Sequence, residues 1–299
     1  MEVIGFGALN LDILCMVERL AKAGEHVAIR DIREFSGGSA ANTISGLSRL
    51  GVKTGFIGAV GNDSEGRKIL DDFSRDGVNL DGIIHLDGRT GVIIGFVDSE
   101  GERTLYPYPG VNDRIEIKHI NLEYVKKTRF LHLSSFVNEK QFKAQKELVE
   151  RLEEFPEIKI SFSPGILYSR RGLKDLLPII KKSLILFVNE TEIEEITGED
   201  YKEGSKTLID SGTEIVAVTL GKDGCYLRTR NENYHIPAYP TKVIDTTGAG
   251  DAFATGFLYG IIQNKRIPYC GRLGNKIASM CIEKFGSRTG LPSKKEIFL

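Results

Sequence analysis

The feature that most constrains the fold is a regular alternation of short apolar runs with amphipathic stretches. Six apolar runs are predicted to be buried strands: residues 3–7, 54–60, 130–133, 158–162, 184–188 and 215–219. Helical periodicity predicts helices between them, at residues 42–50, 65–76, 139–155, 172–181, 191–197 and 201–211. Strands that are apolar throughout need cover on both faces, which is typical of parallel sheets. The sequence therefore predicts an α/β fold of three layers, with a mostly parallel central sheet flanked by helices.

Two segments depart from this rhythm. Residues 26–35 alternate between apolar and polar side chains, and residues 90–98 and 103–108 predict a β-hairpin around residues 99–102. We expect these segments to form an extra antiparallel sheet, inserted into the α/β body and large enough to act as a lid.

The predicted lid is formed by two inserted segments, at about residues 13–35 and 88–110. The sequence shows no repeat, low-complexity tract or linker. Residues 1–299 are therefore predicted to form a single domain, which at this length can bury a sizeable core.

Composition limits the setting in which such a protein acts. Forty basic and 41 acidic side chains leave a formal charge of −1, which predicts no general attraction to nucleic acid or anionic membranes. The apolar runs are far shorter than the ~20 residues of a membrane span, and residues 1–7 show no secretory signal. We expect a cytoplasmic protein, since the cysteines have neither paired nor metal-type spacing: Cys15, Cys225, Cys270 and Cys281.

A glycine-rich turn near the C-terminus carries the strongest chemical pattern. Gly248, Ala249 and Gly250 lead into an apolar helix whose first turn contains Asp251. A helix N-terminus offers unpaired N–H groups and a positive dipole end to an anion, and the aspartate adds a potential base. Phosphoryl transfer needs that combination, whereas a purely structural interpretation makes Asp251 a helix cap.

Polar residues also follow the first predicted strand. Asn10 and Asp12 lie where an open α/β sheet binds ligands, and a carboxylate there can accept hydrogen bonds from the hydroxyls of a polyol. An Asx turn that ends the strand is the alternative interpretation.

Two motifs resemble the signatures of the PfkB/ribokinase family of sugar kinases. The run from Asp245 to Asp251, Asp-Thr-Thr-Gly-Ala-Gly-Asp, is similar to its C-terminal signature. The run from Gly37 to Asn42, Gly-Gly-Ser-Ala-Ala-Asn, is similar to its first signature, and the resemblance covers nearly the whole chain. It implies Asp251 as catalytic base, an anion hole at Gly248, Ala249 and Gly250, and acceptor-binding residues at Asn10, Asp12, Gly37, Gly38 and Asn42.

The same resemblance implies a nucleotide site for ATP. Thr219, Gly221, Lys222 and Gly224 match the family's Thr-x-Gly-x-x-Gly turn beneath the nucleotide, and Asn275 falls where the family contacts the adenine side. The alternative interpretations give these two residues no role in binding. Lys222 would be an exposed lysine in a turn, and Asn275 would be a hydrogen-bonded asparagine in a helix.

The resemblance also implies metal ions. Asn189 and Glu192 match the family's Asn-x-x-Glu motif, which holds Mg²⁺ through water near the triphosphate, although Glu192 also suits a solvated helix face. The resemblance therefore implies Asn189 as a nucleotide-binding residue too. Some members bind a monovalent cation such as K⁺ beside the anion hole. Asp245 is present for that role, while Gly290 stands where ribokinases tend to carry serine.

The implied activity is ATP-dependent phosphorylation of a hydroxymethyl group of a sugar. Two alternatives within the family remain open. Phe35, Phe96 and Tyr106 on the lid strands suit a nucleoside acceptor, and four cationic side chains suit a phosphosugar: Arg30, Arg33, Lys53 and Arg103.

The alternatives of another class have less support. A catalytically idle, metabolite-sensing member is disfavoured because Asp251 is intact, and the sequence contains neither a P-loop nor a complete dinucleotide fingerprint. We also expect a homodimer formed through the lid, because an unpaired apolar sheet edge is a liability.

Overall fold

A nine-stranded sheet forms the centre of the computed structural model, which describes residues 1–99 and 103–297. Neighbouring strands from β5 to β11 are parallel, and β12 and β13 add an antiparallel edge. The strand order is β13 (Asn233–Ile236), β12 (Cys225–Thr229), β11 (Ile215–Thr219), β10 (Ser183–Asn189), β9 (Lys159–Ser163), β8 (Phe130–Ser134), β1 (Val3–Phe6), β4 (Thr54–Val60) and β5 (Ile83–His85).

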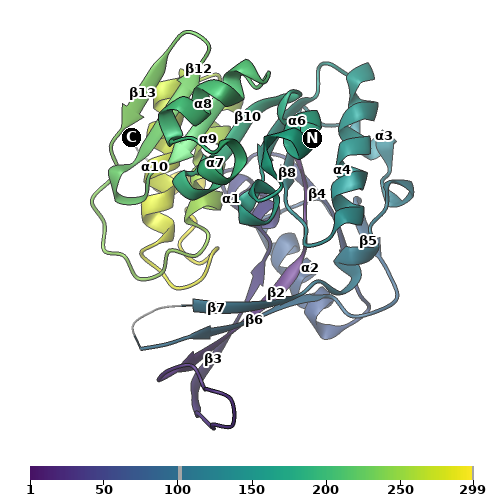
Figure 1. Cartoon of the computed structure of the whole chain (residues 1–299). Helices are drawn as coiled ribbons and strands as arrows, with labels where there is room; N and C mark the ends of the chain where they lie inside the picture. The colour runs from purple at the N-terminus through teal and green to yellow at the C-terminus, as the bar shows by residue number, and fades with distance from the viewer. Residues whose placement is uncertain (100–102, 298–299) are drawn as a thin grey trace.

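Helices cover both faces of this large sheet (Figure 1). One face packs against α4 (Glu139–Arg151), α6 (Gly172–Ile180), α7 (Glu190–Thr197) and α8 (Tyr201–Asp210). The other packs against α1 (Ser39–Arg49), α2 (Ser64–Asp76), α9 (Ala249–Ile262) and α10 (Ile267–Cys281). Two short helices, α3 (Leu122–Val125) and α5 (Gly165–Ser169), complete the body. The predicted three-layer α/β fold is confirmed.

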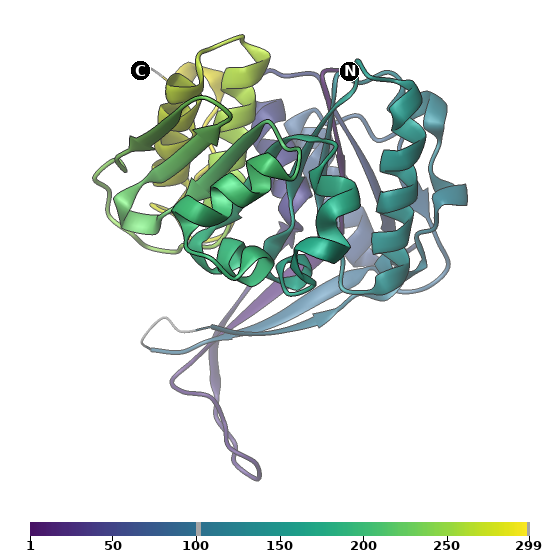
Figure 2. The same cartoon turned by 45° about the horizontal axis from the view of Figure 1, so that its top comes forward.

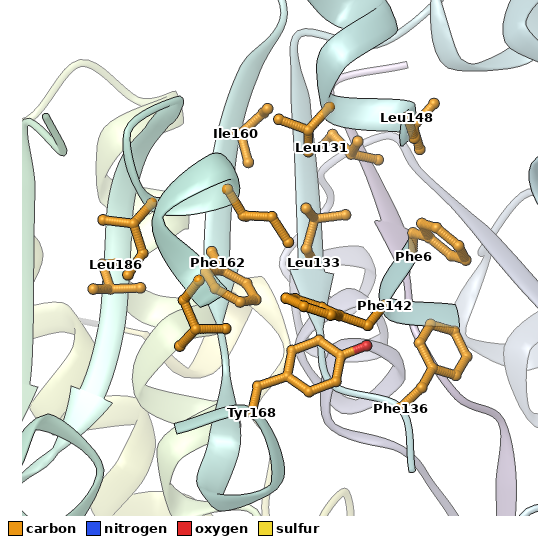
Figure 3. Packing of buried hydrophobic residues seen from close by; sticks show 14 of the residues in the cluster. Phe6, Leu131, Leu133, Phe136, Phe142, Leu148, Ile160, Phe162, Tyr168 and Leu186 are labelled. Carbon is orange, nitrogen blue, oxygen red and sulfur yellow. The ribbon is translucent and has the colours of Figure 1, made fainter. Parts of the chain in front are cut away.

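Alternate residues of each strand supply the two halves of the core. Phe6 and Phe162 belong to the cluster on the α4 side, where Figure 3 shows them beside Phe142 and Tyr168. The rings of Phe142 and Tyr168 meet edge to face at 4.8 Å between centroids. Phe187 belongs instead to the cluster on the α9 side. A period of two therefore places the central strands of the large sheet between two packed layers.

A smaller, four-stranded sheet projects from the body (Figure 1, Figure 2). Its order is β3 (Ile29–Gly37), β2 (Asn10–Val17), β6 (Gly91–Val97) and β7 (Arg103–Tyr108). The predicted hairpin pairing of β6 with β7 is confirmed, while residues 100–102 of its predicted turn lie outside the described residues.

The prediction that this sheet is antiparallel is wrong at one pair, because β2 and β6 run parallel. Strand β2 continues the direction of β1 almost without interruption, and β6 follows β5 in the same way. Since β1 and β5 belong to one parallel sheet, their continuations leave the same edge in the same direction. Strand β2 itself is absent from the prediction, which ended the first strand at residue 7 and placed Asn10 and Asp12 after it.

The two faces of the small sheet differ. Asp12 pairs directly with Phe35, and Leu14 pairs with Arg33, so these side chains share one face. That face is the inner one, because Phe35 and Arg33 both lie over the ring of Phe285 in the C-terminal loop. We call it the inner face, and the opposite one the outer face.

The outer face is partly bare. Near the body, Ser36 donates a hydrogen bond to Asp72 of α2 at 2.6 Å. Further out, Ile32, Ile94 and Tyr106 are 57%, 42% and 59% exposed. In the described part of the chain, no helix is long and apolar enough to cross a membrane.

Candidate active site

The glycine-rich turn begins α9 at the carboxyl edge of the large sheet. Gly248 is the N-cap residue with φ of +77°, and a side chain there would collide with Ser287. The N–H of Ala249 donates to the carbonyl of Thr246 at 3.2 Å, which tightens the turn. Asp251 therefore lies in the first turn of a helix whose start only glycine can form at position 248.

Asp251 is held by two donors from α1. The Ser39 hydroxyl donates to Oδ1 at 2.6 Å, and Asn42 Nδ2 donates to Oδ2 at 2.8 Å. Burial raises the pKa of Asp251 to about 6, against the opposing effects of these hydrogen bonds and of Arg288. A carboxylate with this pKa is mostly ionised at pH 7 and still basic enough to accept a proton from an acceptor hydroxyl.

Asp12 reaches the same region from the inner face of the small sheet. Burial raises its pKa to about 7, while Arg288 lowers it and Asp251 raises it. Its Oδ1 atom is buried and has no hydrogen-bond partner. Since buried polar atoms are normally paired, this oxygen suits a hydroxyl donor on a bound ligand.

The glycine pair fits closely around this carboxylate. A side chain at Gly37 would collide with the carboxylate of Asp12, and one at Gly38 would collide with the carbonyl of Ala8. Gly38 also has φ of +107°, which side chains disfavour. Asn10 lies two residues before Asp12, where its Oδ1 accepts a hydrogen bond from Asn112 Nδ2 at 3.0 Å. The structure thus places Asn10 at the base of the small sheet.

A cavity of about 510 Å³ lies beside the start of α9. Its walls include Ala249 and Gly250 and five of the six residues predicted to contact the nucleotide: Thr219, Gly221, Lys222, Gly224 and Asn275. The sixth, Asn189, lines a smaller cavity instead. Gly224 has φ of +90°, and a side chain there would collide with the carbonyl of Ile236. Asn275 Nδ2 donates to the carbonyls of Ile236 and Pro237, both at 3.0 Å, so this side chain also supports the wall it lines.

A second cavity of about 100 Å³ adjoins the first, and it is lined by Asp251, Asn189 and Glu192. The two cavities share Thr219, Gly250 and Phe253. A Cβ atom at Gly250 would meet no atom within 4 Å. The Gly250 backbone is therefore an open wall between the larger cavity and the surroundings of Asp251.

Asn189 and Glu192 form a capping box at the start of α7. Asn189 Oδ1 accepts from the N–H of Glu192 at 2.8 Å, and Glu192 Oε2 accepts from the N–H of Asn189 at 3.0 Å. Burial and, to a smaller extent, Asp251 raise the pKa of Glu192. The Glu192 carboxylate is partly desolvated, its Oε2 caps the helix, and the residue lines the small cavity. Such a group is suited to bind a divalent cation through water molecules.

Asp245 joins the glycine-rich turn to the C-terminal loop. Its Oδ1 accepts from the N–H of Thr247 at 2.9 Å, and its Oδ2 accepts from the N–H of Gly286 at 2.9 Å. The carboxylate is 92% buried by this arrangement, being only 8% exposed. Its observed contacts fix two loops relative to each other.

Two site residues were missed by the sequence analysis. Ser39 lies inside the first motif, and its hydroxyl was a signal that could have predicted a hydrogen-bond donor to the Asp251 carboxylate. Arg288 lies in the C-terminal loop, where its side chain is 7% exposed and its Nε donates to Asn42 Oδ1 at 2.7 Å. No spacing rule connects Arg288 to Asn42, which are 246 positions apart.

The fold and the glycine-rich helix start define the class of protein: a phosphotransferase of the ribokinase fold. Residues 2–294 match the family described as pfkB family carbohydrate kinase. The chain therefore belongs to the PfkB family of carbohydrate kinases, and the predicted family and enzyme class are confirmed.

Relatives of known sequence or structure agree with this assignment. An uncharacterized sugar kinase of Archaeoglobus fulgidus is 45% identical over 83% of this chain and 98% of its own. An ATP-dependent ribose-1-phosphate kinase of Halopiger xanaduensis is 29% identical, over 96% and 94% of the two chains. The structure of an Arabidopsis thaliana ribokinase complexed with ribose and ATP is 25% identical, with a TM-score of 0.85 over 98% and 96%.

Proposed function

We propose that this carbohydrate kinase transfers the γ-phosphoryl group of ATP to a hydroxymethyl group of a sugar, with Asp251 as the general base. The observation that carries the proposal is the position of Asp251. This residue lines the small cavity and directly follows Gly250, which lines both the small and the large cavity. Five of the six predicted nucleotide residues line the larger cavity and Asn189 lines the adjoining one, which supports ATP as the donor.

The chemistry follows from these positions. Asp251 accepts the proton of the acceptor hydroxyl while the oxygen of that hydroxyl attacks the γ-phosphorus. The bond from that phosphorus to the bridging oxygen breaks, and the electron pair leaves with ADP. Backbone N–H groups of Gly248 and Gly250 at the α9 N-terminus stabilise the charge on the transferred oxygens. Asp12 Oδ1 accepts a hydrogen bond from another acceptor hydroxyl and so orients the sugar.

Asn189 and Glu192 would hold Mg²⁺ through water, as their oxygen donors and the small cavity allow. Magnesium, when bound, neutralises phosphate charge. Lys222, which lines the large cavity, would add a further positive charge near the nucleotide.

The direct test is Mg²⁺-dependent ADP release measured against a panel of sugars, phosphosugars and nucleosides. We expect at least one acceptor to stimulate ADP release, and EDTA to abolish it. Binding of an acceptor without turnover, with every member of the panel, would favour the metabolite-sensing alternative.

A phosphosugar acceptor is the second candidate, and Arg33 is the observation that favours it. Of the cations named from the sequence whose side chains the structure describes, Arg33 alone is on the inner face with Asp12. Arg30 pairs with Glu18 at the exposed end of the sheet, Lys53 precedes β4 at the opposite edge, and the Arg103 side chain lies outside the described residues. Arg33→Gln should lower kcat/KM for a phosphosugar about 10-fold and leave a neutral sugar unchanged, with Arg30→Gln as the matched control.

A nucleoside acceptor has less support. Phe35 lies on the inner face, but Phe96 pairs with Cys15 and lies on the outer face, where its ring meets that of Tyr106 at 6.3 Å. Only one of the three aromatic candidates is therefore placed to stack on a base.

We further propose that the small sheet closes over the acceptor as a lid and that two copies pair through its outer face. Exposed Ile32, Ile94 and Tyr106 form an apolar patch there, which is typical of an interface. Light scattering at micromolar concentration should give twice the mass of 33.1 kDa. Tyr106→Lys should lower that mass, and a monomeric wild type would refute the pairing.

Two smaller proposals complete the assignment. Asp245 is our candidate for a monovalent cation such as K⁺, and exchange of Na⁺ for K⁺ at constant ionic strength should then raise kcat. The four cysteines are free and buried, which supports a cytoplasmic setting. Fractionation of cells from the source should find the activity in the soluble cytoplasmic fraction.

A further inference from the structure

Arg288 is a buried cation inside the site. Its Nε donates to Asn42 Oδ1 at 2.7 Å, and its Nη2 donates to the carbonyl of Gly37 at 3.2 Å. Its guanidinium carbon lies 5.3 Å from the centroid of the Phe73 ring. One side chain thus contacts the end of β3, the first helix α1 and the helix α2.

A structural role alone explains this residue poorly. The Nη1 atom of Arg288 is buried and has no hydrogen-bond partner. Burial also lowers the pKa of the guanidinium to about 10, although Asp76, Asp12 and Asp72 oppose that change. Because a buried charge with an unpaired donor costs stability, an apolar side chain of similar size would serve packing as well or better.

The hydrogen bonds of Asn42 show what the arginine achieves. The Asn42 amide oxygen accepts from Arg288 Nε and, at 3.3 Å, from the Ser287 hydroxyl. Its amide nitrogen donates to Asp251 Oδ2 at 2.8 Å. A guanidinium can only donate, so the amide oxygen must face Arg288 and the amide NH₂ must face Asp251. A reversed amide would set its oxygen against the carboxylate and lose both hydrogen bonds.

We propose that Arg288 is a positioning residue for phosphoryl transfer: it fixes the Asn42 amide so that Asn42 donates to Asp251 and aims the carboxylate at the acceptor hydroxyl. The inference rests on the proposed role of Asp251 as the base. It also gives the C-terminal loop a function, since Arg288 connects that loop to Gly37 beside Asp12.

The experiment uses the full chain with its best acceptor and ATP. Arg288→Met should lower kcat ~10- to 100-fold, because a small misplacement of the base is that costly, and leave KM for ATP within about twofold. The thermal midpoint should stay the same or rise. Arg288→Lys keeps a donor for Asn42 but cannot reach Gly37 as well, so it should recover part of kcat; it also serves if the methionine variant does not fold.

A double-mutant cycle separates positioning from packing. If Arg288 acts through Asn42, then Arg288→Met combined with Asn42→Ala should have the kcat of Asn42→Ala alone, within about twofold. Multiplied losses in the double variant would overturn the proposal, as would a kcat for Arg288→Met within twofold of the wild type.

Arg49 supplies the matched control. It donates to the carbonyl of Arg288 and pairs with Asp76 at 2.7 Å, and within the described part of the chain it makes no hydrogen bond to Asn42. Arg49→Met should lower the thermal midpoint and keep kcat, whereas an equal loss of kcat would assign the effect to loop packing and refute the proposal. An Asp251→Asn variant that retains turnover would instead refute the proposed base, which is a separate failure.

Discussion

The large and small sheets differ in how their strands are covered. Phe162 and Phe187 of the large sheet are 0% and 5% exposed, because helices pack against both faces. Tyr106 on the outer face of the small sheet is 59% exposed. Asp251 is therefore fixed by the packing of the body, whereas Asp12 is carried by a sheet whose outer face is partly bare. The comparison separates a half of the site that is packed on both faces, the rigid half, from the half that we propose to move as a lid.

The largest expected effect tests whether the chemistry belongs to the rigid half. Asp251→Asn keeps the shape of the side chain but cannot take the proton, so kcat should fall ~10²- to 10⁴-fold with KM for ATP little changed. The folded state raises the pKa of Asp251 to about 6, so its ionisation costs stability above that pH. The thermal midpoint of the variant at pH 8 should match or exceed that of the wild type.

Steady-state kinetics and thermal unfolding on the same Asp251→Asn sample check both statements. A turnover near that of the wild type, with a lowered midpoint, would show that Asp251 is only a helix cap.

The second prediction compares packing directly. Phe162→Ala removes a fully buried ring from the large sheet and should cost about 3–5 kcal/mol of unfolding free energy. Tyr106→Ala, on the outer face, should cost within about 0.5 kcal/mol in the monomer. Urea unfolding at submicromolar concentration measures both. Equal losses would mean that the small sheet is packed as firmly as the body.

The third prediction concerns the movable half. At pH 8, above the Asp12 pKa of about 7, Asp12→Asn removes a charged acceptor from the ligand side of the small sheet. It should raise KM for the sugar ~10- to 100-fold, with a smaller effect on kcat. KM for ATP should not change. An unaltered KM for the sugar would show that Asp12 does not hold the acceptor.

The last prediction is a pH dependence of stability that arises at the centre of the large sheet. His132 is fully buried with Nδ1 at 3.0 Å from the Ser161 hydroxyl, and burial lowers its pKa to about 3. The unfolded chain binds a proton near pH 6.5 and the folded chain does not until about pH 3. Stability is therefore lost as pH falls through this window, by up to about 1.4 kcal/mol per pH unit.

Replacing His132 with asparagine should flatten that part of the stability curve. Asp12 and Asp251 have raised pKa values and contribute the opposite slope, so the difference between wild type and variant is the quantity to measure. His26, exposed in the connection between β2 and β3, is the control from the small sheet. An identical slope in wild type and His132→Asn would exclude this contribution.

The same contrast explains what could be predicted from the sequence. Strands such as β4 and β10 are apolar throughout because both faces are covered, and their positions were predicted closely. Strand β5 has only three residues, β12 is buried over its first three residues only, and β13 alternates at the exposed edge, so none of them gives a comparable run. Strand β2 begins with Asn10 and Asp12, and these polar residues interrupt the apolar pattern by which a strand is predicted.

The motifs predicted which residues line the site but not how they connect. Asp251 meets Ser39 across 212 positions, and Asn42 meets Arg288 across 246. These contacts depend on how α1, α9 and the C-terminal loop pack together. No local pattern encodes that packing, which is why the donors to Asp251 appear only in the structure.

The division of the walls between the two cavities also affects the order of catalytic events. All residues lining the large cavity lie between Thr219 and Ile282, and within the described chain none of them belongs to the small sheet. On the proposed assignment, a nucleotide in the large cavity would enter or leave without contacting the small sheet that covers the sugar. ADP and the phosphorylated sugar would then leave by separate routes, and product-inhibition kinetics in which either product can depart first would support this consequence.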